Sequence, residues 1–215
     1  MSDERKGNAA ASLIFATLAL SIGYAVLRYH IAGPVPWKDF PFFILNKGIS
    51  LAAFILIAFN FGLGPLKNIG VPIPGRWLDA RKALGMTGFL LVLIHALISS
   101  LLFKPAIYSS FFMADGTLTL LAGLSMLAGV LAFVVLWAYN LSFQTFLRED
   151  TAFISFITSR RFLLVALTFG GAHLLFRGYK GWAAPEGWHG GLPPISLVAF
   201  SIFALAYVAN LFGRR

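Results

Sequence analysis

Two histidines stand at corresponding places in two apolar stretches of the chain. Residues 81–95 begin with an Arg-Lys pair, run apolar and end in His95, and residues 160–173 begin with an Arg-Arg pair and end in His173. Each histidine follows its basic pair by twelve to fourteen residues, which is roughly 18 to 21 Å of helix at about 1.5 Å per residue. If both pairs mark the same membrane face, both imidazoles lie at the same depth.

An imidazole in hydrocarbon is costly unless it is hydrogen-bonded or ligates a metal. Two imidazoles at one depth on neighbouring helices can hold a metal between them, and in a membrane the commonest candidate is a heme iron. The alternative for each histidine is a hydrogen bond to a neighbouring hydroxyl, such as that of Ser99 or Thr168.

Small residues precede both histidines at helical spacing. Gly85 and Gly88 lie on or near the face of His95, and Ala166 and Gly170 precede His173. Small side chains let a flat macrocycle approach a helix, but in membranes they equally let helices pack closely. We therefore name Gly88 and Gly170 as candidate cofactor contacts, with helix packing as the alternative.

Arg177 follows His173 by one helical turn on the outward side, where it can pair with a heme propionate. The alternative is an ordinary cation at the membrane interface.

Composition identifies an integral membrane protein. Of the 215 residues, 59% are hydrophobic and 12% are charged, and the mean hydropathy is +0.82. The absence of cysteine excludes disulfides, iron-sulfur clusters, thiolate zinc sites and covalent heme attachment, so any heme is held non-covalently. The net charge of +9 arises from cations between apolar spans, which membrane topology explains, and we expect no nucleic-acid partner.

The apolar runs predict an all-α, polytopic membrane protein with six transmembrane helices in one domain, residues 1–215. The first run is longer than the core of a signal peptide and is kept as a span. Residues 141–158 are expected to form an amphipathic loop or a short surface helix. The predicted spans are about 8–30, 40–63, 80–103, 117–140, 160–176 and 194–212.

Six spans put both termini on one side of the membrane. Eleven of the lysines and arginines fall on that side and six on the other, so the positive-inside rule predicts cytoplasmic termini. Both histidines then lie in the outer half of the bilayer. His30 and His189 fall at or beyond the outer interface and are expected to face water, the alternative being an outer docking site shared with Tyr29, Trp182 and Trp188.

A group of cations on the terminal side can hold a flavin phosphate or an anionic lipid head group, although the positive-inside rule already explains it. These cations are Arg76, Arg81, Lys82, Arg160 and Arg161.

Residues 81–95 resemble the third-helix motif of the ferric reductase-like transmembrane family, in which a basic pair and Leu-Gly precede an apolar run that ends in Leu-His. The matching residues here are Arg81, Lys82, Leu84, Gly85 and His95. Within that family the chain is most similar to the heme-binding membrane subunit of the bacterial periplasmic methionine-sulfoxide reductase system. The six-span layout and the late histidine of the fifth span extend the resemblance over most of the chain.

The resemblance implies a b-type cytochrome of the bacterial inner membrane, with one heme b between the third and fifth spans and His95 and His173 as axial ligands. Many relatives carry a second histidine about thirteen residues earlier on the fifth span, but this chain has Ser159, Arg160 and Arg161 there. We therefore expect a single heme, and an electron from the cytoplasmic side then needs a flavin, a quinol or a partner to bridge the inner half.

The expected function is electron relay from a cytoplasmic or membrane-pool donor to an outer acceptor, either a periplasmic molybdenum oxidoreductase or ferric iron. No GxGxxG unit is present, and with both axial positions filled the iron has no open site, so no catalytic residue is assigned. One alternative is a heme-free membrane scaffold or transporter with structural histidines. Another is a quinone-reactive diheme cytochrome, which needs four buried histidines.

Overall fold

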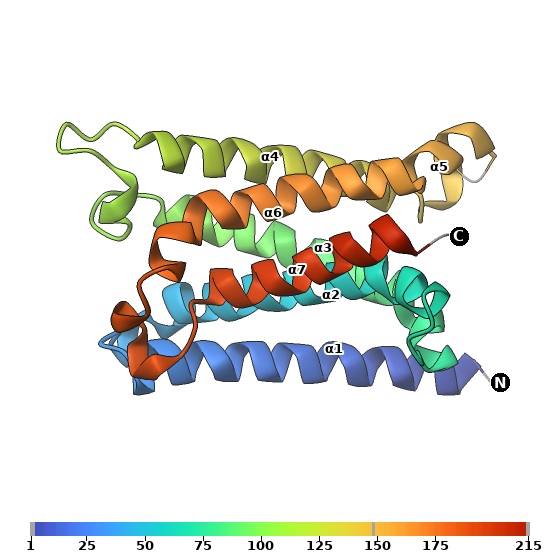
Figure 1. The fold of residues 1–215 in the computed structure, drawn as a ribbon, viewed down its shortest axis with the longest axis horizontal. Helices are drawn as coiled ribbons and strands as arrows, with labels where there is room; N and C mark the ends of the chain where they lie inside the picture. Colours follow the sequence, from blue (N-terminus) through green and yellow to red (C-terminus); the bar gives the residue numbers. More distant parts are fainter. Residues whose placement is uncertain (1–2, 148, 214–215) are drawn as a thin grey trace.

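The computed structural model describes residues 3–147 and 149–213, and its architecture is helical throughout (Figure 1). Within these residues, β-structure is limited to an isolated bridge between Phe112 and Leu118. A π-helical turn, Leu27–Ile31, extends the first helix, and another, Phe40–Ile44, leads into the second. The α-helices are α1 (Asp3–Val26), α2 (Leu45–Asn68), α3 (Gly75–Leu102), α4 (Leu120–Leu141), α5 (Thr151–Ile157), α6 (Arg160–Trp182) and α7 (Ile195–Phe212).

All of these helices except the short α5 are long and apolar enough to cross a membrane, which makes six candidate spans in the described chain. They run alternately in opposite directions, and both termini lie at one end of the bundle, here called the terminal end (Figure 1). The opposite end is called the distal end. The predicted all-α protein with six apolar spans is confirmed.

Helix α6 continues well beyond the range predicted for the fifth span and ends at Trp182. The Trp182 indole Nε1–H donates to Ser196 Oγ of α7 at 3.0 Å. The indole also lies over Gly178, where an added Cβ would stand 2.3 Å from Nε1. This contact holds the last turns against α7 although the local sequence is rich in glycine. As a result, Arg177 lies within a helix.

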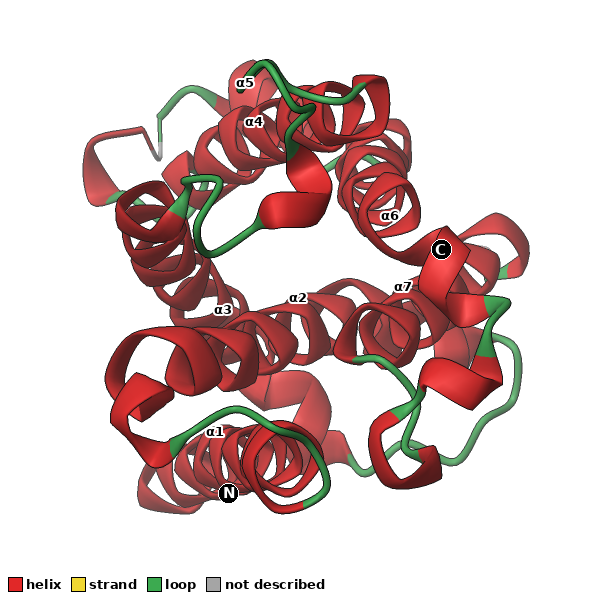
Figure 2. Ribbon diagram, turned by 90° about the vertical axis from the view of Figure 1, so that its left-hand side faces the viewer, coloured by secondary structure: helices red, strands yellow, loops and turns green. Residues whose placement is uncertain are grey.

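Helix α2 is the centre of the bundle. In its most apolar window 61% of residues are buried, against 17–33% in the other five spans. It packs against α1, α3 and α7, while α6 packs against α4 and α7. Viewed from one end, α2, α3, α4, α6 and α7 form a ring with α1 outside it (Figure 2).

Apolar side chains fill the terminal half of this ring. The cluster there joins Phe61 of α2, Tyr139 of α4, Leu163 of α6 and Phe203 of α7. The rings of Phe61 and Tyr139 meet edge to face with centroids 5.0 Å apart. The terminal half is therefore a packed core.

The distal half of the ring is not filled in this way. Helices α3 and α6 have no extensive contact with each other in the described chain, and α3 touches α4 over a much shorter length than it touches α2. A cavity lies between these helices, and both histidines line it.

The contact between α1 and α2 gives a stability prediction. An added Cβ at Gly48 would lie 2.8 Å from Ile22 Cα, so Gly48→Ala forces the backbone of α1 away. We expect a cost of about 1–3 kcal/mol, measured as a lower thermal unfolding midpoint in detergent. Gly23→Ala is the matched control, because nothing lies within 4 Å of its added Cβ. Equal midpoints for the two variants would contradict this packing.

Candidate cofactor site

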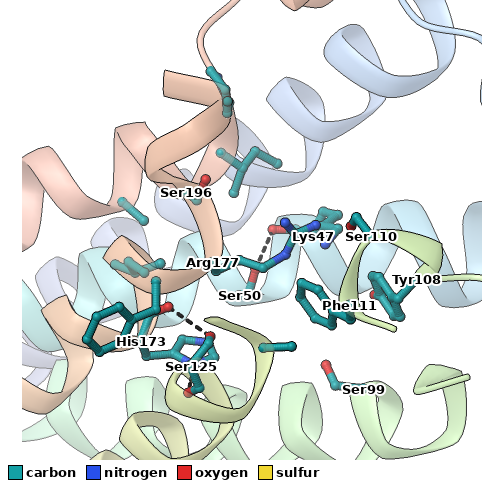
Figure 3. A pocket seen from close by; sticks show the side chains of 18 of the residues that line it. Lys47, Ser50, Ser99, Tyr108, Ser110, Phe111, Ser125, His173, Arg177 and Ser196 are labelled. Atoms are coloured by element: carbon teal, nitrogen blue, oxygen red, sulfur yellow. Dashed lines mark hydrogen bonds between the residues drawn. The ribbon is translucent and has the colours of Figure 1, made fainter. Parts of the chain in front are cut away.

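The cavity in the distal half of the bundle has a volume of about 780 Å³. This lies in the range of roughly 300–1,000 Å³ that is typical of ligand and cofactor pockets. All five helices of the ring contribute to its wall, together with the segment that joins α3 to α4. Figure 3 shows residues from these elements converging on it.

His95 enters the cavity from α3 and is anchored by α2. Its Nδ1–H donates to Asn46 Oδ1 at 2.8 Å, and Asn46 Nδ2 in turn donates to Ser99 Oγ at 3.0 Å. Asn46 is 1% exposed, so its amide is fixed by burial. Because a carbonyl oxygen only accepts hydrogen bonds, Nδ1 carries the proton and Nε2 keeps its lone pair.

His173 enters from α6 and is anchored by α4. Its Nδ1–H donates to the Ser125 carbonyl oxygen at 2.9 Å, and Ser125 Oγ–H donates back to the His173 carbonyl at 3.0 Å. Figure 3 shows this pair at the edge of the cavity. The same reasoning fixes the tautomer, so Nε2 of His173 is also the unprotonated nitrogen.

These contacts address the alternative of purely structural histidines. Ser99 Oγ lies 3.4 Å from His95 Nδ1, but Thr168 is not a partner of His173, because its hydroxyl donates to the Leu164 carbonyl at 2.8 Å. In the described residues, each ring is hydrogen-bonded through Nδ1 and neither Nε2 has a partner. Ligating histidines in proteins usually donate their second ring N–H to a carbonyl or carboxylate in this way.

The wall around His173 is shaped by two residues that sequence reasoning did not identify. An added Cβ at Gly129 of α4 would lie 2.8 Å from His173 Nδ1, so only glycine leaves room for the ring in this position. On α2, the Phe54 ring lies nearly parallel to the imidazole, with centroids 6.4 Å apart and an angle of 14°.

Gly88 and Gly170 do not line the cavity. An added Cβ at Gly88 would lie 2.9 Å from Ile57 Cγ1 of α2, and one at Gly170 would lie 2.5 Å from Phe203 Cε1 of α7. Both glycines therefore serve close helix packing, the alternative that their spacing left open. Gly85 likewise faces α2, at Asn60.

Cations gather at the distal end of the cavity. Arg28, Lys47, Arg177 and Lys180 all line it, and none of its described lining residues is acidic. The predicted candidate Arg177 is therefore a cavity residue, with its guanidinium 4.4 Å above the ring of Phe111. The sequence interpretation counted Lys47 and Arg28 only as topology-setting charges.

Tyr108 lies beside these cations, in the segment between α3 and α4. It is 8% exposed, and burial raises the pKa of its phenol above the usual value. The hydroxyl therefore remains protonated at neutral pH and is available as a hydrogen-bond donor.

His30 and His189 lie outside the cavity, half-buried among the distal loops. The His30 Nδ1–H donates to the Val35 carbonyl at 2.9 Å, and its ring centroid lies 5.0 Å from that of Trp37. The ring of His189 lies 6.3 Å from that of Tyr29. Neither lies beside His95 or His173 in the cavity wall.

The terminal cations are Arg76, Arg81, Lys82, Arg160 and Arg161. Three of them contact the protein itself. Arg81 Nε donates to the Asn60 carbonyl at 2.8 Å, the Lys82 ammonium lies 5.8 Å from the Phe143 ring, and Arg160 donates to a carbonyl near the end of α7. A flavin or lipid partner for the group stays a prediction.

The cavity offers two histidine nitrogens as possible metal ligands, so any metal bound there would need most of its coordinating atoms from a cofactor. The described residues contain no cluster of three or more His, Asp or Glu side chains that could hold a bare metal ion. Two imidazoles with free Nε2 atoms complete the coordination of an iron porphyrin, whose ring supplies the other nitrogens. In donor type, His95 and His173 therefore fit the two protein ligands that a heme iron would need.

No protein-family model matches this chain, and no curated sequence matches it significantly.

The close approach of Gly129 to His173 predicts an effect on one histidine alone. Gly129→Ala should displace the His173 ring, because the added methyl would overlap Nδ1. NMR spectra of protein labelled at histidine should show the His173 resonances shifted and those of His95 unmoved. Gly123→Ala on the same helix is the control, since its Cβ meets nothing within 4 Å. A spectrum of Gly129→Ala identical to wild type would refute this placement of the ring.

Proposed function

We propose that this chain is a b-type cytochrome subunit that relays electrons across the distal half of a membrane. A single observation carries the proposal. Imidazoles from α3 and α6 line one cavity, and each is bound through Nδ1 to a carbonyl oxygen, so that Nε2 remains for a metal. In this proposal His95 and His173 are the axial ligands of one non-covalent heme b.

The chain's own residues would position such a group. Asn46 and the Ser125 carbonyl fix the ring orientations, Gly129 leaves room for one imidazole, and Phe54 provides an apolar wall. Second contacts of this kind raise the basicity of ligating imidazoles. When bound, heme b would supply one-electron redox chemistry, and an iron held by both His95 and His173 would favour relay over catalysis at the metal.

The packed terminal half supports a single heme. Phe61, Tyr139, Leu163 and Phe203 pack together there, and none of the four histidines lies among them. Arg160 and Arg161 stand at the start of α6 where many relatives carry a histidine. An electron from the terminal side therefore needs a flavin, a quinol or a partner protein to reach the cavity.

The membrane topology indicates on which side of the membrane the electron acceptor would lie. With the termini in the cytoplasm of a bacterial cell, as the cation asymmetry favours, the cavity lies in the periplasmic half of the inner membrane. The acceptor would be a periplasmic oxidoreductase, such as a molybdenum enzyme, or ferric iron, and the donor would be cytoplasmic or a membrane quinol.

The proposal predicts a specific visible spectrum. The purified protein should show a Soret band and, on reduction, the sharp alpha and beta bands of a low-spin bis-histidine heme. His95→Ala and His173→Ala should each lose most of the bound heme, because one axial nitrogen disappears. His30→Ala and His189→Ala serve as matched controls and should retain it. A correctly inserted but colourless wild-type protein would remove the cytochrome proposal and favour the heme-free scaffold or transporter.

A second prediction concerns the anchor of His95. Asn46→Leu removes the acceptor of the His95 Nδ1–H, so the imidazole becomes a poorer donor to iron. We expect heme affinity to fall about 10- to 100-fold and the midpoint potential to rise, because the oxidised iron is less well stabilised. Spectroelectrochemical titration measures both. Ser201→Ala is the control, because Ser201 is exposed on α7 outside the cavity and its hydroxyl donates to the Leu197 carbonyl of its own helix. An unchanged potential in Asn46→Leu would show that the His95–Asn46 hydrogen bond does not tune the site.

A further inference from the structure

The distal end of the cavity holds an excess of positive charge within a membrane-spanning bundle. Lys47 belongs to α2 and Arg177 to α6, both inside candidate spans, and Arg28 lies in the π-helical turn that extends α1. The lining residues that the structure describes include no Asp or Glu, and none of these three cations has an ion pair there. Charges at this depth are costly unless they are paired.

Lys47 is held in place by aromatic rings. Its ammonium lies 5.3 Å from the ring centroid of Phe43 and 5.2 Å from that of Tyr108. Cation–π contacts hold a cation partly desolvated without neutralising its charge. The Lys47 side-chain nitrogen is therefore positioned in the cavity wall, where an anionic ligand would stabilise its charged form.

Arg177 is held in the same manner above Phe111, at 4.4 Å from the ring centroid. Figure 3 shows Lys47 and Arg177 together at the distal side of the cavity, away from His173, and the two positive charges repel each other. Lys47 and Arg177 come from different helices, and no acidic side chain among the described lining residues balances their charges. An anionic ligand between them would remove this repulsion.

Arg28 adds a third positive charge to the cavity wall. Its residue is 4% exposed, and one terminal guanidinium nitrogen donates to the Leu192 carbonyl. Its Nε is buried and has no hydrogen-bond partner. Because this nitrogen has almost no accessible surface, Arg28 contributes positive charge to the cavity wall and not a donor for a ligand.

We propose that Lys47 and Arg177 form a carboxylate clamp at the distal end of the cavity, with Arg28 adding positive charge to its wall. Arginine presents a planar set of donors that matches a carboxylate, while lysine supplies a mobile point charge. The Tyr108 hydroxyl adds an uncharged donor beside them. Cations from separate helices match a ligand that carries two carboxylates.

Two sources can supply this chemistry. One source is the pair of propionates of a heme in the cavity, and this possibility rests on the proposed function. It implies that the propionate edge of the porphyrin points to the distal aqueous side. The other is a free dicarboxylate that enters from that side, and it requires no heme.

The first experiment tests whether the clamp binds the propionates of a heme. Full-length protein freed of heme is titrated with protoheme and with its dimethyl ester, in which both propionates are uncharged. Wild type should bind protoheme about ten- to hundredfold more tightly, as expected for charge-assisted hydrogen bonds. Lys47→Met and Arg177→Gln should lose most of that preference while the bis-histidine spectrum is kept, and Lys47→Arg should restore it. Lys104→Met, an exposed cation at the distal end outside the cavity, is the matched control and should behave as wild type.

The second experiment titrates the heme-free protein with succinate by calorimetry. Succinate binding that is lost in Lys47→Met and Arg177→Gln, but kept in Lys104→Met, supports the clamp with a free dicarboxylate as its ligand. This result counts equally if no heme binds at all, so failure of the cytochrome proposal is distinguished from failure of the clamp. The clamp is overturned if the wild type neither prefers protoheme to its ester nor binds succinate, or if the two variants match wild type in both titrations.

Discussion

The arrangement of the site depends on the hydrogen bond that ties each cavity imidazole to a neighbouring helix. His95 of α3 is held by Asn46 of α2, and His173 of α6 is held by the Ser125 carbonyl of α4. Each bond fixes the tautomer and the direction of the ring, and each joins two helices that form the cavity wall. The same two contacts therefore shape the cavity wall and use the Nδ1 atom of each ring, which leaves Nε2 without a partner in the described chain. Without them, the buried histidines would be flexible polar groups in an apolar bundle.

The two halves of the bundle follow different packing rules. The terminal half is filled by apolar and aromatic side chains from four helices, which fixes the helix positions there. The distal half keeps a cavity whose wall carries hydroxyl groups as well as apolar side chains near the histidines, and cations towards the end. A packed core in the terminal half allows the distal half to carry buried polar groups, because the stability lost there is offset by close helix contacts in the terminal half at residues such as Gly62 and Gly85.

Much of this arrangement follows from residues close together in the sequence. Hydropathy alone predicted six spans, and the spacing of His95 and His173 from their basic pairs selected the two residues that now share a cavity. The partners of these histidines were beyond reach, because Asn46 and Ser125 lie on other helices and nothing local marks them. For Gly88 and Gly170 the sequence left both cofactor contact and helix packing open, because spacing along a helix does not say which neighbour a face meets. Lys47 was overlooked because a count of loop charges treats every cation as a topology signal.

The short contact between α3 and α4 has a consequence for biogenesis. The segment that joins these helices covers the distal end of the cavity with aromatic rings, but the helices themselves diverge beside it. If the cavity holds the proposed heme, the few contacts between α3 and α4 would have to part for the heme to enter from the bilayer. Such an entry would leave the packed terminal core intact.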